Sequence, residues 1–129
     1  MDDVDLAPLV GIGGCLAVLG ALVYPYLVAD GSVGTYYGSG VVNPLVAGLL
    51  AMVAIIVLAA GRQGRTDPGV AAGAGIVFGL FMIALTLAWG LTTRLDAVAL
   101  SELHRWSLPA VSALVAIGSL WYGRALGLL

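Results

Sequence analysis

The sequence is poor in reactive and charged side chains. It contains no lysine, one cysteine and one histidine, and charged residues make up 9% of its 129 positions. A single cysteine excludes an intrachain disulfide. One histidine among scattered carboxylates lacks the spacing of a metal site and cannot supply a pair of axial haem ligands, so we expect no metal or other cofactor. The net charge of −2 without a polybasic segment argues against nucleic-acid binding.

The sequence is instead rich in apolar residues, which make up 61% of the chain. A soluble domain of this size could not bury so much apolar surface, so a lipid bilayer is the expected solvent. Four apolar runs are expected to cross a hydrocarbon core about 30 Å thick, as helices of one domain, residues 1–129. They cover residues 6–28, 44–60, 69–91 and 108–126. The acidic first residues lack the positive charge of a secretory signal, so the first run is expected to be a retained span.

Prolines mark the expected beginnings of these helices, because a proline in the first turn removes an amide hydrogen that has no partner there. Four of the five prolines stand at such positions: Pro8, Pro44, Pro68 and Pro109. Asp5, Asn43 and Asp67 precede three of them as expected N-caps. Pro25 is expected to kink or end the first helix.

Residues 92–107 predict a short amphipathic helix lying at the membrane interface. The expected fold is therefore all-α: an integral membrane four-helix bundle with this interfacial helix before the last span. The segment contains the densest polar cluster of the sequence, Arg94, Asp96, Glu102, His104 and Arg105. It could form a ligand or ion site or a pH-sensing lid, since histidine titrates near neutrality. We favour a solvated helix whose charges keep it out of the bilayer.

The third span begins with glycines spaced for close helix packing. Gly69, Gly73, Gly75 and Gly79 are expected to form a groove that admits another helix backbone. The first span also carries recurring small residues, and we expect it to pack into this groove. In the first span, Gly11-Ile12-Gly13-Gly14 is interpreted as a run of helix-packing residues and not as a dinucleotide-binding motif.

Polar groups inside the spans are few, and no Asp, Glu, Lys, Arg or His falls near the middle of a span. Proton-coupled transport normally needs such a group, and small four-span multidrug exporters carry a glutamate in the first span that this chain lacks. Cys15 is expected to be inert. The leading hypothesis is a non-enzymatic packing or accessory subunit that associates with lipids and with a second copy or another membrane protein. The alternative is an oligomeric channel or transporter with a pore lined by Thr86, Ser112 and Ser119. An enzymatic role has support only from the His104 cluster, and we assign no catalytic residue.

Basic residues limited to arginine, spans rich in small apolar residues and acidic ends resemble the uncharacterised small four-span membrane proteins of haloarchaea. The resemblance has no specific motif and implies no site residue. Arg62, Arg65 and Arg124 are expected on the side of the N-terminus, opposite Arg94 and Arg105. This distribution favours a multi-pass protein of the cell membrane with both termini in the cytoplasm.

Overall fold

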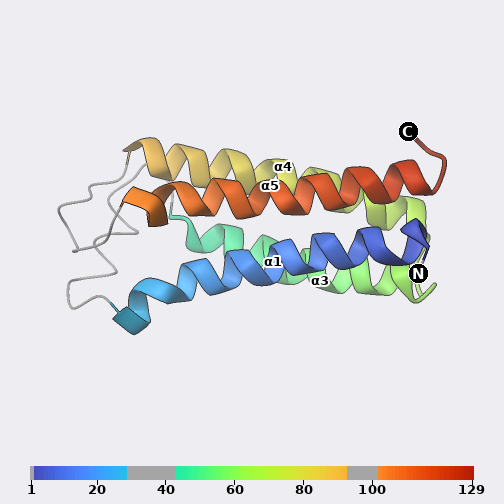
Figure 1. The fold of residues 1–129 in the computed structure, drawn as a ribbon, viewed down its shortest axis with the longest axis horizontal. Helices are drawn as coiled ribbons and strands as arrows, with labels where there is room; N and C mark the ends of the chain where they lie inside the picture. Colours follow the sequence, from blue (N-terminus) through green and yellow to red (C-terminus); the bar gives the residue numbers. More distant parts are fainter. Residues whose placement is uncertain (1, 29–42, 93–101) are drawn as a thin grey trace.

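The computed structural model describes residues 2–28, 43–92 and 102–129, with only the backbone described at 25, 26, 28, 92 and 102–105. This part of the chain contains four helices and no strand (Figure 1). They are α1 (Asp3–Val28), α3 (Leu45–Arg62), α4 (Pro68–Thr92) and α5 (Glu102–Ala125). All four are long and apolar enough to cross a membrane. The prediction of an all-helical four-span bundle is confirmed.

The first helix begins earlier than expected. Leu6 donates its amide hydrogen to the carbonyl of Asp2 at 2.9 Å, and α1 starts at Asp3. Asp5 therefore lies within the helix and is not its cap. Pro8 falls in the second turn, where it supplies no amide hydrogen to the carbonyl of Val4. The helix also continues past Pro25, and its last turns bend away from the other helices (Figure 1).

The last helix also begins before its expected start. Glu102 opens α5, and Pro109 lies inside the helix instead of in its first turn. Proline's fixed φ is compatible with a helix, but the ring crowds the carbonyl of Arg105 and supplies no amide hydrogen to it. Burial of Pro109 in the bundle favours the continuous helix. Residues 102–107 of the expected interfacial helix thus belong to α5, and residues 93–101 lie outside the described part.

The two middle helices start close to their predicted positions. Asp67 accepts a hydrogen bond on Oδ1 from the amide of Gly69 at 2.8 Å, and its carbonyl accepts one from Ala71 at 3.0 Å. It therefore caps α4, with Pro68 as the first helical residue. Asn43 Oδ1 accepts from the amide of Leu45 at 3.0 Å, and α3 begins at Leu45, one residue after Pro44.

The helices α3 and α5 end in the same capping motif. Beyond α3, the amide of Arg65 donates to Ala60 and that of Gly64 donates to Gly61. Beyond α5, the amide of Leu128 donates to Gly123 and that of Gly127 donates to Arg124. Each is a Schellman motif with a left-handed glycine, Gly64 at φ 75° and Gly127 at φ 80°. Both helix ends lie at the end of the bundle that holds the chain termini (Figure 1).

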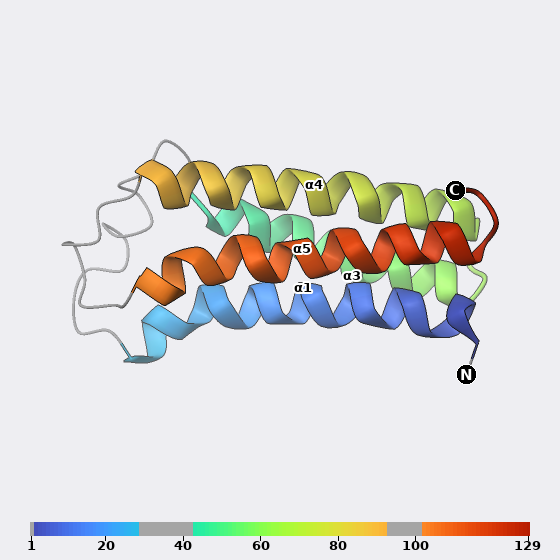
Figure 2. The same cartoon turned by 45° about the horizontal axis from the view of Figure 1, so that its top comes forward.

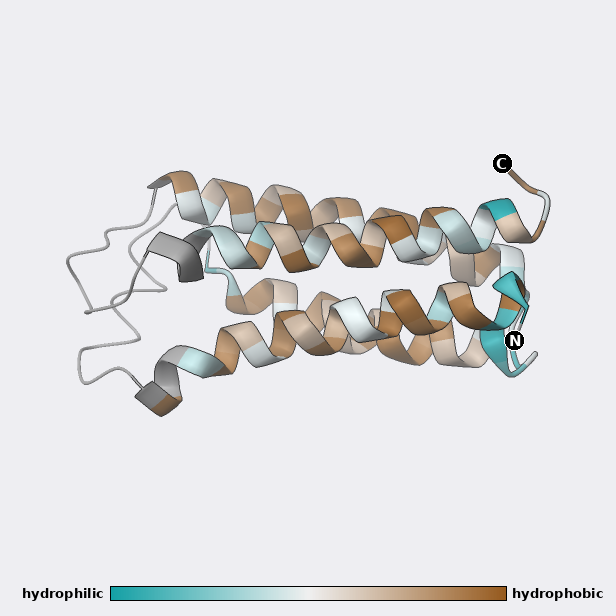
Figure 3. Cartoon of the chain, in the orientation of Figure 1, coloured by the Kyte–Doolittle hydropathy of each residue, from teal (hydrophilic) through white to brown (hydrophobic). Residues whose placement is uncertain are grey.

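In cross-section the helices form a square. The adjacent pairs are α1–α3, α3–α4, α4–α5 and α5–α1, which places α1 and α4 on one diagonal and α3 and α5 on the other. Figure 2 shows α5 lying between α1 and α4. The most strongly hydrophilic stretches of the helices lie at the end with the termini, and most of each helix is apolar (Figure 3). The square arrangement decides which small residues face each other.

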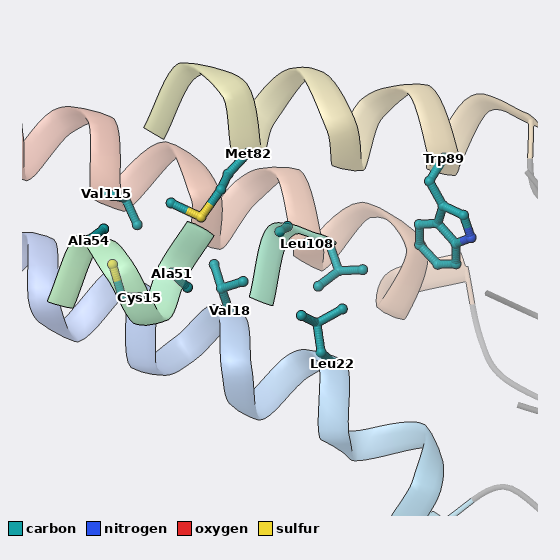
Figure 4. Packing of buried hydrophobic residues seen from close by; sticks show 10 residues of the cluster. Cys15, Val18, Leu22, Ala51, Ala54, Met82, Trp89, Leu108 and Val115 are labelled. Atoms are coloured by element: carbon teal, nitrogen blue, oxygen red, sulfur yellow. The ribbon is translucent and has the colours of Figure 1, made fainter. Parts of the chain in front are cut away.

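Two clusters of buried side chains fill the bundle. The larger, drawn in Figure 4, includes Val18 and Leu22 of α1, Met82 and Trp89 of α4 and Leu108 of α5. The smaller, around Leu58 and Tyr122, lies toward the end with the termini. Between and within these clusters, small residues allow the helix backbones to approach.

Candidate functional site

In the half of the bundle nearer the termini, all four helices contribute to one layer around the bundle axis. We call Gly11 of α1, Leu58 of α3, Gly75 of α4 and Ser119 of α5 the central layer. A Cβ added at Gly11 would lie 2.8 Å from Leu58 Cδ1 and 3.7 Å from Ser119 Oγ. A Cβ added at Gly75 would meet Ser119 Oγ directly and lie 3.2 Å from Leu58 Cδ2. The glycines of α1 and α4 thus leave space, and the Leu58 and Ser119 side chains of α3 and α5 occupy it.

The hydroxyl of Ser119 is the unusual group in this layer. Ser119 is 0% exposed, and among the described residues its Oγ is the buried side-chain atom without a hydrogen-bond partner. The oxygen points at the Gly75 backbone, at the position where another residue would carry its Cβ. This direction suits a weak Cα–H···O contact between α4 and α5. An unpartnered buried hydroxyl typically costs about 1–3 kcal/mol.

In the described part of the chain, the other buried threonine and serine side chains, Thr86 and Ser112, are bonded to their own helices. Thr86 Oγ1 donates to the carbonyl of Met82 at 2.7 Å, and Ser112 Oγ donates to the carbonyl of Leu108 at 2.7 Å. Both residues are 0% exposed. This is the usual bonding pattern of serine and threonine inside a helix. Only Ser119 departs from it.

The predicted glycine groove of α4 packs against α5 and not against α1. A Cβ at Gly79 would lie 2.7 Å from the backbone nitrogen of Ala116, and one at Gly69 would lie 2.9 Å from Leu128 Cδ1. Gly75 faces Ser119, as described above. Gly73 is exposed, and a Cβ there would have no neighbour within 4 Å. The expected pairing with α1 is wrong because α1 and α4 lie on a diagonal of the square.

The small residues of α1 also pack against α5. A Cβ at Gly118 would lie 2.5 Å from the Gly11 nitrogen, and one at Gly14 would lie 2.9 Å from the Val115 nitrogen. Helix α5 therefore approaches the backbones of both α1 and α4. Gly118 was not among the predicted packing residues. The four-residue spacing of Ser112 and Ala116 in α5 indicates a packing face on the side toward α4. Gly118 belongs to the neighbouring face, toward α1.

Within the described helices, three glycines lie on the outer surface of the bundle. Gly13 and Gly20 of α1 and Gly73 of α4 are exposed, and a Cβ at any of them would meet nothing within 4 Å. Intramolecular packing therefore does not explain glycine at these positions. Cys15, in contrast, is 0% exposed and lies in the larger core cluster (Figure 4).

The expected interfacial cluster lies largely outside the described residues. Arg94 and Asp96 fall in residues 93–101, and only the backbone is described at Glu102, His104 and Arg105, in the first turn of α5. Its hypothesised ligand site stays a prediction. Within the described ranges, no three His, Cys, Asp or Glu side chains are placed to hold a metal ion.

Comparison with known proteins assigns the chain to a family without assigning a function. Residues 1–127 match the model of a family described as a family of unknown function, DUF7548. No curated protein and no solved structure matches the chain. The match confirms an uncharacterised family across the chain, and the haloarchaeal resemblance stays a prediction.

Proposed function

We propose that this chain, which belongs to the family of unknown function DUF7548, is a non-enzymatic packing or accessory subunit in the membrane. The observation that carries the proposal is the set of outer glycines Gly13, Gly20 and Gly73, each with open space where a side chain would stand. In lipid, small residues on a helix surface let another helix approach closely. Glycine also disfavours the helix by about 1 kcal/mol relative to alanine, so its presence on an outer face calls for a reason.

The bundle interior supports the same proposal. Leu58 and Ser119 fill the central layer. The hydroxyl groups of Thr86 and Ser112 donate hydrogen bonds to backbone carbonyls of their own helices. The outer surface of the bundle is therefore the proposed binding surface for a second copy or another membrane protein. We place the protein in the cell membrane with both termini in the cytoplasm, since Arg62, Arg65 and Arg124 lie at the end with the termini.

Two leucine variants separate the outer surface from the inner packing. Gly73→Leu places a large side chain on the outer face without an intramolecular clash, so it is expected to reduce association and leave the four-helix fold intact. Val77→Leu, at a position 50% exposed on the same helix, is the matched control. Native mass spectrometry after gentle extraction measures association, and circular dichroism checks the fold. Equal association of Gly73→Leu, Val77→Leu and the unchanged protein would show that Gly73 does not contribute to association.

A small oligomeric channel or transporter is the second candidate, and the Ser119 hydroxyl favours it. A buried hydroxyl without a partner is a group that a permeating ion or polar solute could use. This hypothesis predicts a solute flux in reconstituted vesicles that rises with protein amount and falls in Ser119→Val. No flux of ions or small polar solutes at any protein amount would contradict it.

A further inference from the structure

The arginines at the end with the termini have no carboxylate partner in the described part of the chain. Arg62, Arg65 and Arg124 are exposed, and among the described residues no carboxylate oxygen lies within 4.0 Å of their guanidinium nitrogens. The aspartates of this end lie at the beginnings of α1 and α4, where helix N-terminal amides favour negative charge, and the backbone of Asp5 lies against Arg62. Guanidinium groups at the end of a membrane span lie at the depth of lipid headgroups.

Two of these arginines belong to one capped turn. Arg62 is the last residue of α3, and the Schellman motif at Gly64 folds the chain back so that the amide of Arg65 donates to Ala60 at 2.8 Å. Arg62 Nε donates to the carbonyl of Asp5 at 3.0 Å. This bond holds the guanidinium against the start of α1 and leaves both Nη groups without a partner among the described residues.

We propose that Arg62 and Arg65 bind the phosphodiester of an anionic lipid headgroup at the corner between α1 and α3. A guanidinium presents paired N–H groups that match phosphate oxygens, and the Nε bond of Arg62 orients that pair in advance. Arg65 supplies a second positive charge from the same turn. The lipid source follows from the position at the end of a span, which a headgroup reaches from the membrane plane.

Single-charge variants provide the test. Phosphatidylglycerol binding to the full chain in phosphatidylcholine nanodiscs is measured by native mass spectrometry, with the proportion of phosphatidylglycerol varied. Arg65→Gln removes one charge from the proposed site, and Arg124→Gln removes one charge from the same end of the bundle. Both residues are exposed and neither side chain forms a hydrogen bond or ion pair within the described part, so both variants are expected to fold. We expect about a fivefold loss of affinity in Arg65→Gln and affinity close to wild type in Arg124→Gln.

A third variant tests the orientation of the guanidinium. Arg62→Lys keeps the charge and loses the paired N–H groups, so it is expected to bind phosphatidylglycerol more weakly than wild type. Equal losses in Arg65→Gln and Arg124→Gln would overturn the site and leave a diffuse attraction of the whole face. Displacement of phosphatidylglycerol by inorganic phosphate, but not by chloride at the same ionic strength, would overturn the lipid assignment in favour of a soluble phosphate.

Discussion

Gly79 gives the sharpest prediction about the packing of α4 on α5. A Cβ at this position would lie 2.7 Å from the backbone nitrogen of Ala116 and 2.8 Å from its Cα. Both atoms are backbone, so no side chain can rotate away, and an ordinary contact of 3.4 Å requires the helices to separate by about 0.7 Å. Separation of this kind in a packed interior costs about 1–3 kcal/mol.

Gly73→Ala is the matched control, because a Cβ there would meet nothing within 4 Å. The gain in helix propensity, about 1 kcal/mol, is common to both alanine variants. Their difference therefore isolates the contact with α5, and Gly79→Ala should be less stable than Gly73→Ala by about 1–3 kcal/mol.

The assay is reversible unfolding in mixed micelles, followed by circular dichroism and tryptophan fluorescence. Equal stabilities, or a more stable Gly79→Ala, would show that α4 and α5 do not approach as closely as their backbones indicate.

Three further substitutions test other parts of the bundle in the same assay. Ser119→Ala should leave stability unchanged or raise it by up to about 1 kcal/mol, because it removes an unpartnered hydroxyl; a clear loss would mean that the hydroxyl makes a stabilising contact with Gly75. Leu58→Ala should lower the free energy of unfolding by about 2–5 kcal/mol because it opens a cavity in the central layer. Ile56 is 68% exposed on the same helix, so Ile56→Ala should change that free energy little. Similar losses in the two variants would contradict the assignment of buried and exposed faces on α3. Gly64→Ala should cost about 1 kcal/mol because its φ of 75° is left-handed, and an unchanged stability would argue against the Schellman cap of α3.

The sequence predicts the four membrane-spanning helices and most of their bounds, because those depend on local chemistry. Apolar runs identify the spans, and Asp67 followed by Pro68 predicts the start of α4 correctly. The same proline rule fails at Pro109, since a helix that is buried in a bundle can continue through a proline. Local rules carry no information on whether neighbouring helices stabilise an extra turn.

The arrangement of the helices was less predictable than their number. Glycine spacing identifies α4 as a packing helix, yet it does not say which helix fills the groove, and α1 is an equally small-residue-rich candidate. The partner is α5, and Gly73 turns outward although it continues the spacing. The central layer likewise depends on Leu58, whose sequence position in an apolar run does not distinguish it from its lipid-facing neighbours.

The most direct test of the proposed accessory role is the mass of the protein extracted gently with its native lipids, with any associated protein identified in the same sample. The proposal predicts a defined assembly that contains a second copy or a stoichiometric partner, and dissociation of that assembly in Gly73→Leu. A lone monomer that retains its helical fold would contradict the role of the outer glycines and the accessory-subunit proposal with it.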